Sequence, residues 1–522
     1  MLGHSAWLAL LPVARAALYD TVVQTSHGPV MGYRAFNSSP SGIGLGRWEE
    51  IAVWKGIPFA ANTSGENRFR PPQPAEAWDE VRYAADFGPV CPSATSGMND
   101  YTINEDCLNL NIWSVANSSS DKLPVVMWSY PAESTARDDL FNGGGMAAQD
   151  VVFVNYNYRT GSFGWLATPE LSEERLATVG VNSSGNWGML DQFAALKWIK
   201  ANIASFGGDP DHITVMGQSA GSAATYHILN SPLTEGDIVG AIIESGVRDP
   251  HDPLCTSLAE GYTTLEDSLA TGESFMTSLS CSDIACMRAL PMDDLITSFM
   301  GSSYSFSATL DHYAMPATYL EALEAGAANQ VPVLTGNTKD ESGANFNITL
   351  SLAEYLVDLN ETFSGVWIER FFDLYPANDS TSAPGAYNSQ WTDRSKVGTW
   401  LWTQLWANAS TEDVYTYFWD HAPPGEDRGA YHESEINYVL NNLYDTDPPW
   451  TEEDYVIAAR MNGYWVNFIK TGNPNGGNLT EWPATDSSPL VQHVGNGWGQ
   501  IPVADAAKVS LFEDWFATLT AY

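Results

Sequence analysis

The sequence predicts an α/β protein with a large, mixed and mostly parallel central sheet and helices on both faces. Short continuous apolar runs recur along the chain, which is the pattern of strands buried on both faces. Longer segments between them carry apolar residues at helical spacing. With 522 residues, of which 44% are hydrophobic, the chain can also bury a large core. This alternation favours helical layers that cover one sheet.

The predicted strands are the apolar runs themselves. They cover residues 124–130, 150–158, 213–217, 241–245, 331–336 and 414–420. Residues 190–206 carry apolar side chains at helical spacing, and so does much of 454–470. Length alone would suggest about three domains, but no long linker, repeat or composition break divides the chain. We therefore expect residues 18–522 to form a single domain.

The strongly acidic composition excludes one class of partner. The chain has 63 acidic against 23 basic residues and a formal net charge of −40. Nucleic acid and anionic membrane surfaces are bound through Lys and Arg, so both would repel this chain. The acidity fits solubility in an acidic medium.

The first 17 residues have the pattern of a secretory signal peptide. An apolar run covers residues 6–14, and Ala14-Arg15-Ala16 is a small-x-small cleavage pattern. A buried first helix is the alternative interpretation. No other apolar run reaches the ~18 residues that a membrane span needs. We therefore expect a secreted, extracellular protein without a membrane span.

Two further features fit export into an oxidising compartment. Nine Asn-x-Ser/Thr sequences are candidate N-glycosylation sites, at Asn37, Asn62, Asn117, Asn182, Asn347, Asn360, Asn378, Asn408 and Asn478. The five cysteines are too few for a disulfide scaffold, but they suit two local disulfides and one remaining thiol. None shows Cys/His metal-ligand spacing, so we expect no metal and no cofactor.

A nucleophile is predicted where one apolar run meets a helix. The stretch ITVMGQSAGSAA leads through Gly217, Ser219 and Gly221 into a helix that we expect to begin near Ser222. Gly-x-Ser-x-Gly in a strand-turn-helix context is the nucleophile elbow. The small residues let neighbouring backbone pass close by, and the helix N-terminus favours negative charge beside the hydroxyl.

Longer motifs around this turn resemble one protein family. FGGDPDHITVMGQSAG (206–221) resembles the active-serine signature of type-B carboxylesterases, the family of cholinesterases and fungal lipases. EDCLNLNIW (105–113) resembles their second signature, with Asn109 where an aromatic residue or Thr is usual. The similarity extends from RFRPPQP near Phe69 to YWVNFIKTGNPN, ending near Asn475. The resemblance implies the α/β-hydrolase fold and a secreted, fungal-type carboxylesterase.

This resemblance also implies the rest of a catalytic triad, in the order Ser, Asp/Glu, His. GNTKDESGANF resembles the family's acid loop and makes Glu341 the carboxylate, with Asp340 as the alternative; Ser342 stands where Gly is usual. GAYHESEINYVL resembles the histidine loop and makes His432 the base. His432 would take the proton of Ser219 as the serine attacks an ester carbonyl.

Two further residues are assigned supporting roles behind the triad. Ser245 resembles a serine near the family's triad, and a plain strand-end serine is the alternative interpretation. Gln218, beside the nucleophile, is assigned a similar role.

The oxyanion loop is where the chain departs from the family. There, an aromatic residue or His is followed by glycines whose amides bind the oxyanion together with the residue after the serine, here Ala220. This chain has Tyr130-Pro131-Ala132-Glu133 instead. Proline has no amide hydrogen, so we expect a reshaped hole with donors from Ala132, Glu133 and Ala220. The Glu133 side chain either points to solvent or is a protonated or proton-relaying group.

The family resemblance also implies the disulfides. Cys91 would pair with Cys107 and close a segment that forms the lid in related lipases, here only fifteen residues long. Cys281 and Cys286 resemble the next bridge, with Cys255 as a possible competitor. A short lid segment favours a soluble or small ester over a long-chain triglyceride.

The sequence therefore predicts a secreted serine carboxylesterase that acts through an acyl-enzyme on a small-molecule ester. An acyl transferase or another repurposed enzyme on the same serine elbow is the alternative, because of the altered oxyanion loop. A non-catalytic adhesion or binding protein on this fold is the second alternative, since a fold does not determine function.

Overall fold

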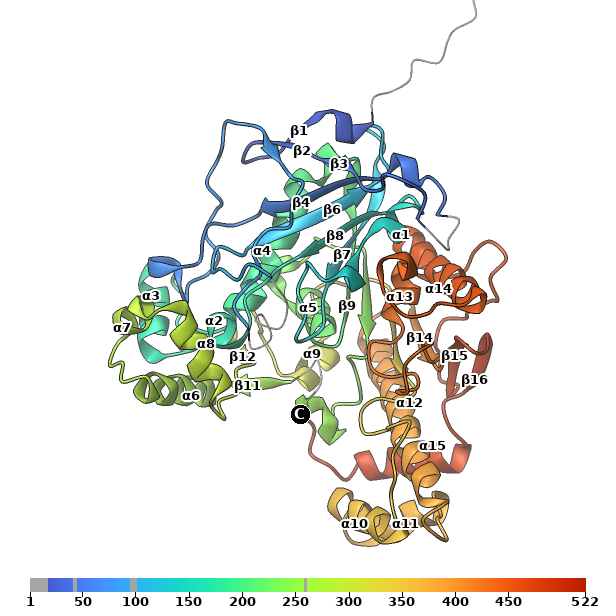
Figure 1. Cartoon of the computed structure of the whole chain (residues 1–522). Coiled ribbons are helices and arrows are strands. Elements are labelled where there is room, and N and C mark those ends of the chain that lie inside the picture. The colour runs from blue at the N-terminus through green and yellow to red at the C-terminus, as the bar shows by residue number, and fades with distance from the viewer. Residues whose placement is uncertain (1–16, 41–44, 94–100, 258–260) are drawn as a thin grey trace, which may run out of the picture.

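The computed structural model describes residues 17–40, 45–93, 101–257 and 261–522, and the predicted signal segment lies almost entirely outside them. An 11-stranded sheet runs through the molecule (Figure 1), with strand order β16-β15-β14-β13-β10-β9-β7-β8-β6-β4-β3. The expected large mixed sheet with flanking helices is confirmed.

The centre of this sheet is parallel, and its strands follow the predicted apolar runs. The parallel strands are β7 (Leu123–Ser129), β8 (Val152–Tyr156), β9 (Gly208–Gln218), β10 (Gly240–Glu244), β13 (Val333–Thr338), β14 (Val414–Trp419) and β15 (Leu490–Val494). Antiparallel strands lie at both edges: β3 (Tyr33–Arg34), β4 (Ala52–Pro58), β6 (Asn109–Ser114) and β16 (Gly499–Pro502). All six predicted strands are present, with ends shifted by a few residues.

Helices cover both faces of the sheet, because alternate side chains of buried strands point to opposite sides. One layer contains α4 (Trp187–Asn202), α5 (Ala220–Asn230), α9 (Tyr319–Ala325) and α12 (Ala383–Ala409). The other contains α1 (Gly144–Ala147), α13 (Ile436–Leu440) and α14 (Glu452–Thr471). Both predicted helices are present, and 190–206 splits into α4 and a 3₁₀ turn at Ile203–Phe206.

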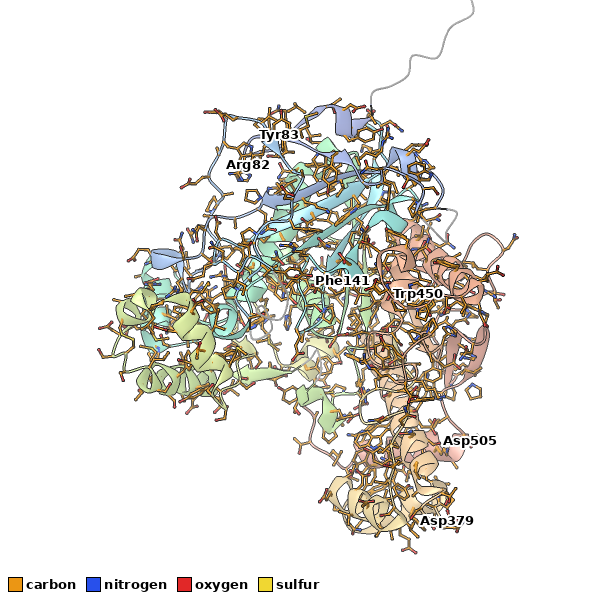
Figure 2. All side chains as sticks on the ribbon, in the orientation of Figure 1. Arg82, Tyr83, Phe141, Asp379, Trp450 and Asp505 are labelled. Carbon is orange, nitrogen blue, oxygen red and sulfur yellow. A yellow bond between two sulfur atoms is a disulfide. The ribbon has the colours of Figure 1, made fainter. Side chains whose placement is uncertain are left out.

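Two smaller hydrophobic clusters flank the main core. One joins α10 (Leu352–Thr362), α11 (Val366–Leu374) and α15 (Ala506–Phe516) to α12. The other joins α2 (Gly161–Trp165), α3 (Pro169–Val179), α6 (Leu265–Ser278), α7 (Ile284–Ala289) and α8 (Met292–Met300). Figure 2 shows Phe141 inside the molecule and Asp379 at its far end near α10 and α11. The single-domain interpretation stays a prediction.

The remaining strands form two small sheets. The first contains β1 (Val22–Gln24), β2 (Pro29–Met31) and β5 (Arg82–Tyr83), and the second pairs β11 (Tyr262–Thr264) with β12 (Ala308–Leu310). Within the described ranges, no helix has the length and apolar character that a membrane crossing requires.

Two buried ion pairs connect segments that are far apart in the sequence. Arg159, after β8, donates from Nε to Asp191 on α4 at 2.7 Å, and its backbone N–H binds the same carboxylate. Arg68 makes a second buried pair with Glu105, with 2.7 Å between Nε and a carboxylate oxygen. Each charge is paired and hydrogen-bonded, which is what makes its burial tolerable. The first pair ties the segment after β8 to α4, and the second ties Arg68 to the segment that leads into β6.

The two expected disulfides are both present. Cys91 bonds Cys107, and Cys281 bonds Cys286. Cys255 is buried and outside both bridges, and its Sγ contacts the carbonyl oxygen of Asp249 at 3.2 Å. Residues 94–100 of the predicted lid segment lie outside the described residues.

Candidate active site

Ser219 occupies a strained turn between β9 and α5. Its backbone has φ 55° and ψ −120°, a region that residues other than glycine rarely adopt. The Ser219 N–H donates to the carbonyl of Glu244 at the end of β10, at 3.0 Å. Such strain persists only where the surrounding structure enforces it. The helix begins at Ala220, slightly before the expected Ser222.

The two glycines of the pentapeptide are required by close backbone approach. A Cβ on Gly221 would collide with the carbonyl of Ser129, which ends the neighbouring strand β7. A Cβ on Gly217 would collide with the carbonyl of Gly221. The serine can therefore stand at this sheet edge only because the residues two positions before and after it have no side chains.

Glu341 lies buried in the loop after β13. Its Oε2 is 2.6 Å from Nδ1 of His432, and its Oε1 accepts from the backbone N–H of Thr338 at 2.9 Å and from Ser245 Oγ at 3.2 Å. Burial acts to raise the pKa of Glu341, but the hydrogen bond and charge of His432, with smaller effects of Arg248 and Ser245, lower it overall. Glu341 is thus an ionised hydrogen-bond acceptor for the histidine.

His432 forms part of a cavity wall, and 37% of its side-chain surface is exposed. Burial acts to lower the pKa of His432, but the hydrogen bond and charge of Glu341, with Glu435 and Glu433, raise it to about 9. The amide nitrogen of Gln218 lies 3.4 Å from both ring nitrogens. The carboxylate at Nδ1 leaves Nε2 available to accept a proton from a nucleophile.

The raised pKa of His432 predicts an alkaline pH dependence. The histidine must be neutral to accept the serine proton, so kcat/KM should fall as the pH falls through the pKa of His432. We expect kcat/KM for a neutral 4-nitrophenyl ester to rise with pH, with a midpoint clearly above the ordinary histidine value of about 6.5. A midpoint at or below that value would contradict the Glu341–His432 coupling.

Ser219 and His432 line the same cavity, which has a volume of about 730 Å³. Aromatic and small side chains dominate its walls, among them Trp165, Phe299, Phe306, Ala223 and Ala224. The lining comes from α2, α5, α8, the strand ends and several loops. A cavity of this size and apolar character suits a small organic molecule.

The stretch that stands in place of the family's glycine loop forms part of the wall of this cavity. Tyr130 stacks on Tyr158 with 4.6 Å between ring centroids, and the Tyr158 hydroxyl donates to the Tyr130 carbonyl at 3.0 Å. Pro131, Ala132 and Glu133 all line the cavity, and Glu133 is exposed. The backbone of Glu133 has a φ of 64°, so this turn contains a residue in the left-handed region although that residue is not a glycine.

The other candidate residues have structural partners. The carboxylate of Asp340, the alternative acid, accepts from the backbone N–H of Ala430 at 2.8 Å and so fastens the histidine loop. Ser245 has φ 51°, and its backbone N–H donates to the carbonyl of Gly336. In the part of the chain that the structure describes, no group of three or more His, Cys, Asp or Glu side chains is placed to hold a metal ion.

A serine at a strained strand-to-helix turn, a histidine in the same cavity and a carboxylate on that histidine define a serine hydrolase of the α/β-hydrolase class. The chain matches the Carboxylesterase family over residues 19–496, and it belongs to this family. It is a carboxylesterase of the type-B kind.

Similar proteins and structures agree with this assignment. The chain is 32% identical to fumonisin B1 esterase of Sphingopyxis macrogoltabida over 503 residues, which cover 91% of each chain. It is 30% identical to para-nitrobenzyl esterase of Bacillus subtilis, over 83% of this chain and 89% of that protein. A solved structure of PNB esterase superimposes with a TM-score of 0.74 at 27% identity, covering 94% and 99% of the two chains. The expected α/β-hydrolase fold is confirmed.

Sequence reasoning missed several residues that shape the site. Arg248 is buried and lowers the pKa of Glu341, although it lies far from Glu341 in the sequence. Tyr158 holds the chain just after β7 through a hydrogen bond from its hydroxyl to the carbonyl of Tyr130. Glu435 is buried, and it lies three residues after His432 in the sequence. This short separation from the predicted base could have marked it as a residue near the site.

Proposed function

We propose that the protein hydrolyses a soluble or small carboxylic ester through an acyl-enzyme on Ser219. His432 takes the serine proton and delivers it to the leaving alcohol, and Glu341 holds the imidazole and stabilises its charged form. Water then attacks the acyl-enzyme with His432 as base. The observation that carries this proposal is the 2.6 Å contact between Glu341 and His432 beside a cavity that Ser219 also lines.

The oxyanion hole of this proposal uses backbone amides of Ala220, Ala132 and Glu133. All three residues line the cavity with Ser219, and the Ala220 amide lies at the N-terminus of α5. Pro131 cannot donate, so the hole depends on the amides after it. Loss of one such donor typically slows catalysis by about 10²–10³-fold. The left-handed turn at Glu133 supports this arrangement, because it redirects consecutive amides without glycine.

The proposed substrate is small because the acid and alcohol parts must share one cavity. The cavity volume of about 730 Å³ fits a compact molecule. Only fifteen residues separate Cys91 from Cys107, so the segment that forms a lid in related lipases is short here. We therefore expect activity on dissolved ester without activation by a lipid interface.

The proposal includes secretion of a glycosylated, fungal-type enzyme. The N-terminal pattern, the two disulfides and the acidic composition support export. Of the nine Asn-x-Ser/Thr sites, eight asparagines are exposed and Asn117 is half-buried, so a glycosyltransferase could reach them. Enzymatic deglycosylation of the secreted protein, followed by mass spectrometry, would identify the sites that carry glycans.

The proposed reaction is tested with 4-nitrophenyl acetate, butyrate and octanoate, and with analysis of the products. We expect turnover that favours the two short chains and releases free carboxylic acid. A parallel reaction with an added alcohol acceptor separates hydrolysis from acyl transfer. Preferential formation of a new ester, or a preference for octanoate only above its solubility limit, would overturn the proposal.

A further inference from the structure

Beneath the triad lies a group of buried polar side chains that the proposed mechanism does not use. Glu244 ends β10, Glu435 lies just before α13, and both are 0% exposed. Tyr417 on β14 is 1% exposed and faces both carboxyl groups. We call Glu244, Glu435 and Tyr417 the buried carboxyl cluster.

Hydrogen bonds within the described residues leave this cluster under-satisfied. Glu244 Oε1 accepts from the indole N–H of Trp465 at 2.6 Å. Its other carboxyl oxygen, both carboxyl oxygens of Glu435 and the Tyr417 hydroxyl have no well-formed hydrogen bond among these residues. Two ionised carboxylates buried in this way would be very costly, and buried acids usually respond by keeping a proton. A neutral acid can donate a hydrogen bond to an adjacent carboxyl oxygen, which an ionised pair cannot do.

The acidic groups that face Glu435 act in the same direction as burial. Glu435 is faced by Glu244 from β10, Glu341 from the loop after β13 and Tyr417 from β14, with His432 on its own loop. Burial raises the pKa of Glu435 well above its usual range, and Glu244 and Glu341 raise it further, while His432 opposes them. Burial also raises the pKa of Glu244 to about 8, against the hydrogen bond from Trp465.

The cluster joins the two parts of the active site that must be held together. The Glu244 carbonyl accepts the N–H of Ser219, so the end of β10 supports the nucleophile turn. Glu435 lies three residues after His432, in the turn that leads into α13. A hydrogen bond between the two carboxyl groups would therefore link the support of the serine to the support of the histidine.

We propose that Glu244 and Glu435 form a carboxyl pair that retains a proton at neutral pH, and that Glu435 is a positioning residue for His432. It acts as an uncharged hydrogen-bond donor in this role. The positioning role rests on the proposed function, because it concerns the placement of the histidine relative to Ser219. The retained proton can be measured in the absence of esterase activity.

The positioning role is tested with Glu435→Met and Glu435→Gln on 4-nitrophenyl butyrate. Methionine keeps the volume but cannot donate, so we expect kcat to fall at least about tenfold with KM changed less than about twofold, since small misplacements of catalytic groups are costly. Glutamine keeps an uncharged donor and should recover most of kcat with a similar pH midpoint. Glu433→Met, on the same loop, is the matched control and should reduce kcat much less.

Several outcomes would overturn the positioning role. Equal losses in Glu435→Gln and Glu435→Met, with the pH midpoint moved toward that of free histidine, would mean that Glu435 acts as a negative charge. Full activity in Glu435→Met would show that Glu435 does not position His432. An equal loss in Glu433→Met would show a general disturbance of the loop.

The retained proton is tested by infrared spectroscopy of the folded protein at neutral pH, which also covers the case in which Glu435→Met does not fold. We expect a protonated-carboxyl C=O band in the wild type and in Ser219→Ala that is lost in the Glu244→Gln/Glu435→Gln double variant. Its persistence in the double variant, or its absence from the wild type, would overturn the pair. A band in a wild-type protein that has no esterase activity would instead show that the proposed function fails while the pair stands.

Discussion

Ser219→Ala should lower kcat for 4-nitrophenyl butyrate by at least about 10⁴-fold, because removing a triad nucleophile costs as much as removing the triad. The change deletes one hydroxyl at a position whose φ of 55° is held by the surrounding strands. Alanine and serine meet similar strain there, so the fold should be retained. Steady-state kinetics and circular dichroism, with a thermal melt, measure the two effects separately.

Ser134→Ala is the matched control, because Ser134 also lines the cavity. We expect it to keep activity within a few-fold of the wild type. Undiminished activity in Ser219→Ala would show that the strained turn is not the nucleophile site. A similar loss in both variants would point to damage to the cavity.

Glu341→Gln should lower kcat by about 10⁴-fold, the loss seen when the acid of a triad loses its charge. The amide has nearly the same shape as the carboxyl, but it cannot stabilise the charged imidazole and favours the wrong tautomer. The pKa of His432 should then fall from about 9 toward the ordinary value, because Glu341 is the main group that raises it. The pH profile of kcat/KM measures this displacement.

Asp340→Asn decides between the two acids that the sequence left open. The Asp340 carboxylate accepts the Ala430 amide and fastens the loop, so its loss should reduce activity less than about tenfold. If Asp340→Asn were inactive and Glu341→Gln active, Asp340 would be the acid of the triad. The 2.6 Å contact of Glu341 with His432 predicts the opposite order.

Much of the central sheet could be predicted because its strands are buried on both faces. Such strands are continuous apolar runs, and β7, β10 and β14 match the predicted runs closely, whereas β9 begins at Gly208, before its predicted start at 213. The antiparallel strands β4 and β6 were missed. In β6, apolar residues are interrupted by Asn109 and Asn111, which are both buried. Asn111 donates to Asn155 on β8 at 2.7 Å, and Asn109 donates to the carbonyl of Pro89 at 2.9 Å. A polar side chain whose partner lies on another strand gives no apolar signal.

The site could be predicted only as far as local motifs reach. The nucleophile turn was identified from five consecutive residues, since the need for glycine on both sides of Ser219 arises from backbone contacts that the motif itself requires. The direction of Glu133 was left open, and the structure places it exposed in the wall of the cavity. The cavity walls come from helices and loops scattered along the chain, and no spacing in the sequence connects them.

The α/β class and the family could be predicted from the sequence alone, and Ser219 could be predicted as the nucleophile, because apolar runs and the elbow motif encode local geometry. Which side chains contact one another depends on the tertiary structure. His432 contacts Glu341, which is 91 residues away in the sequence, and Glu435 lies in the same buried environment as Glu244. These side chains meet because parallel strands bring their carboxyl ends to one sheet edge. Their pKa values then follow from burial and from neighbouring charges, which exist only once the sheet has formed.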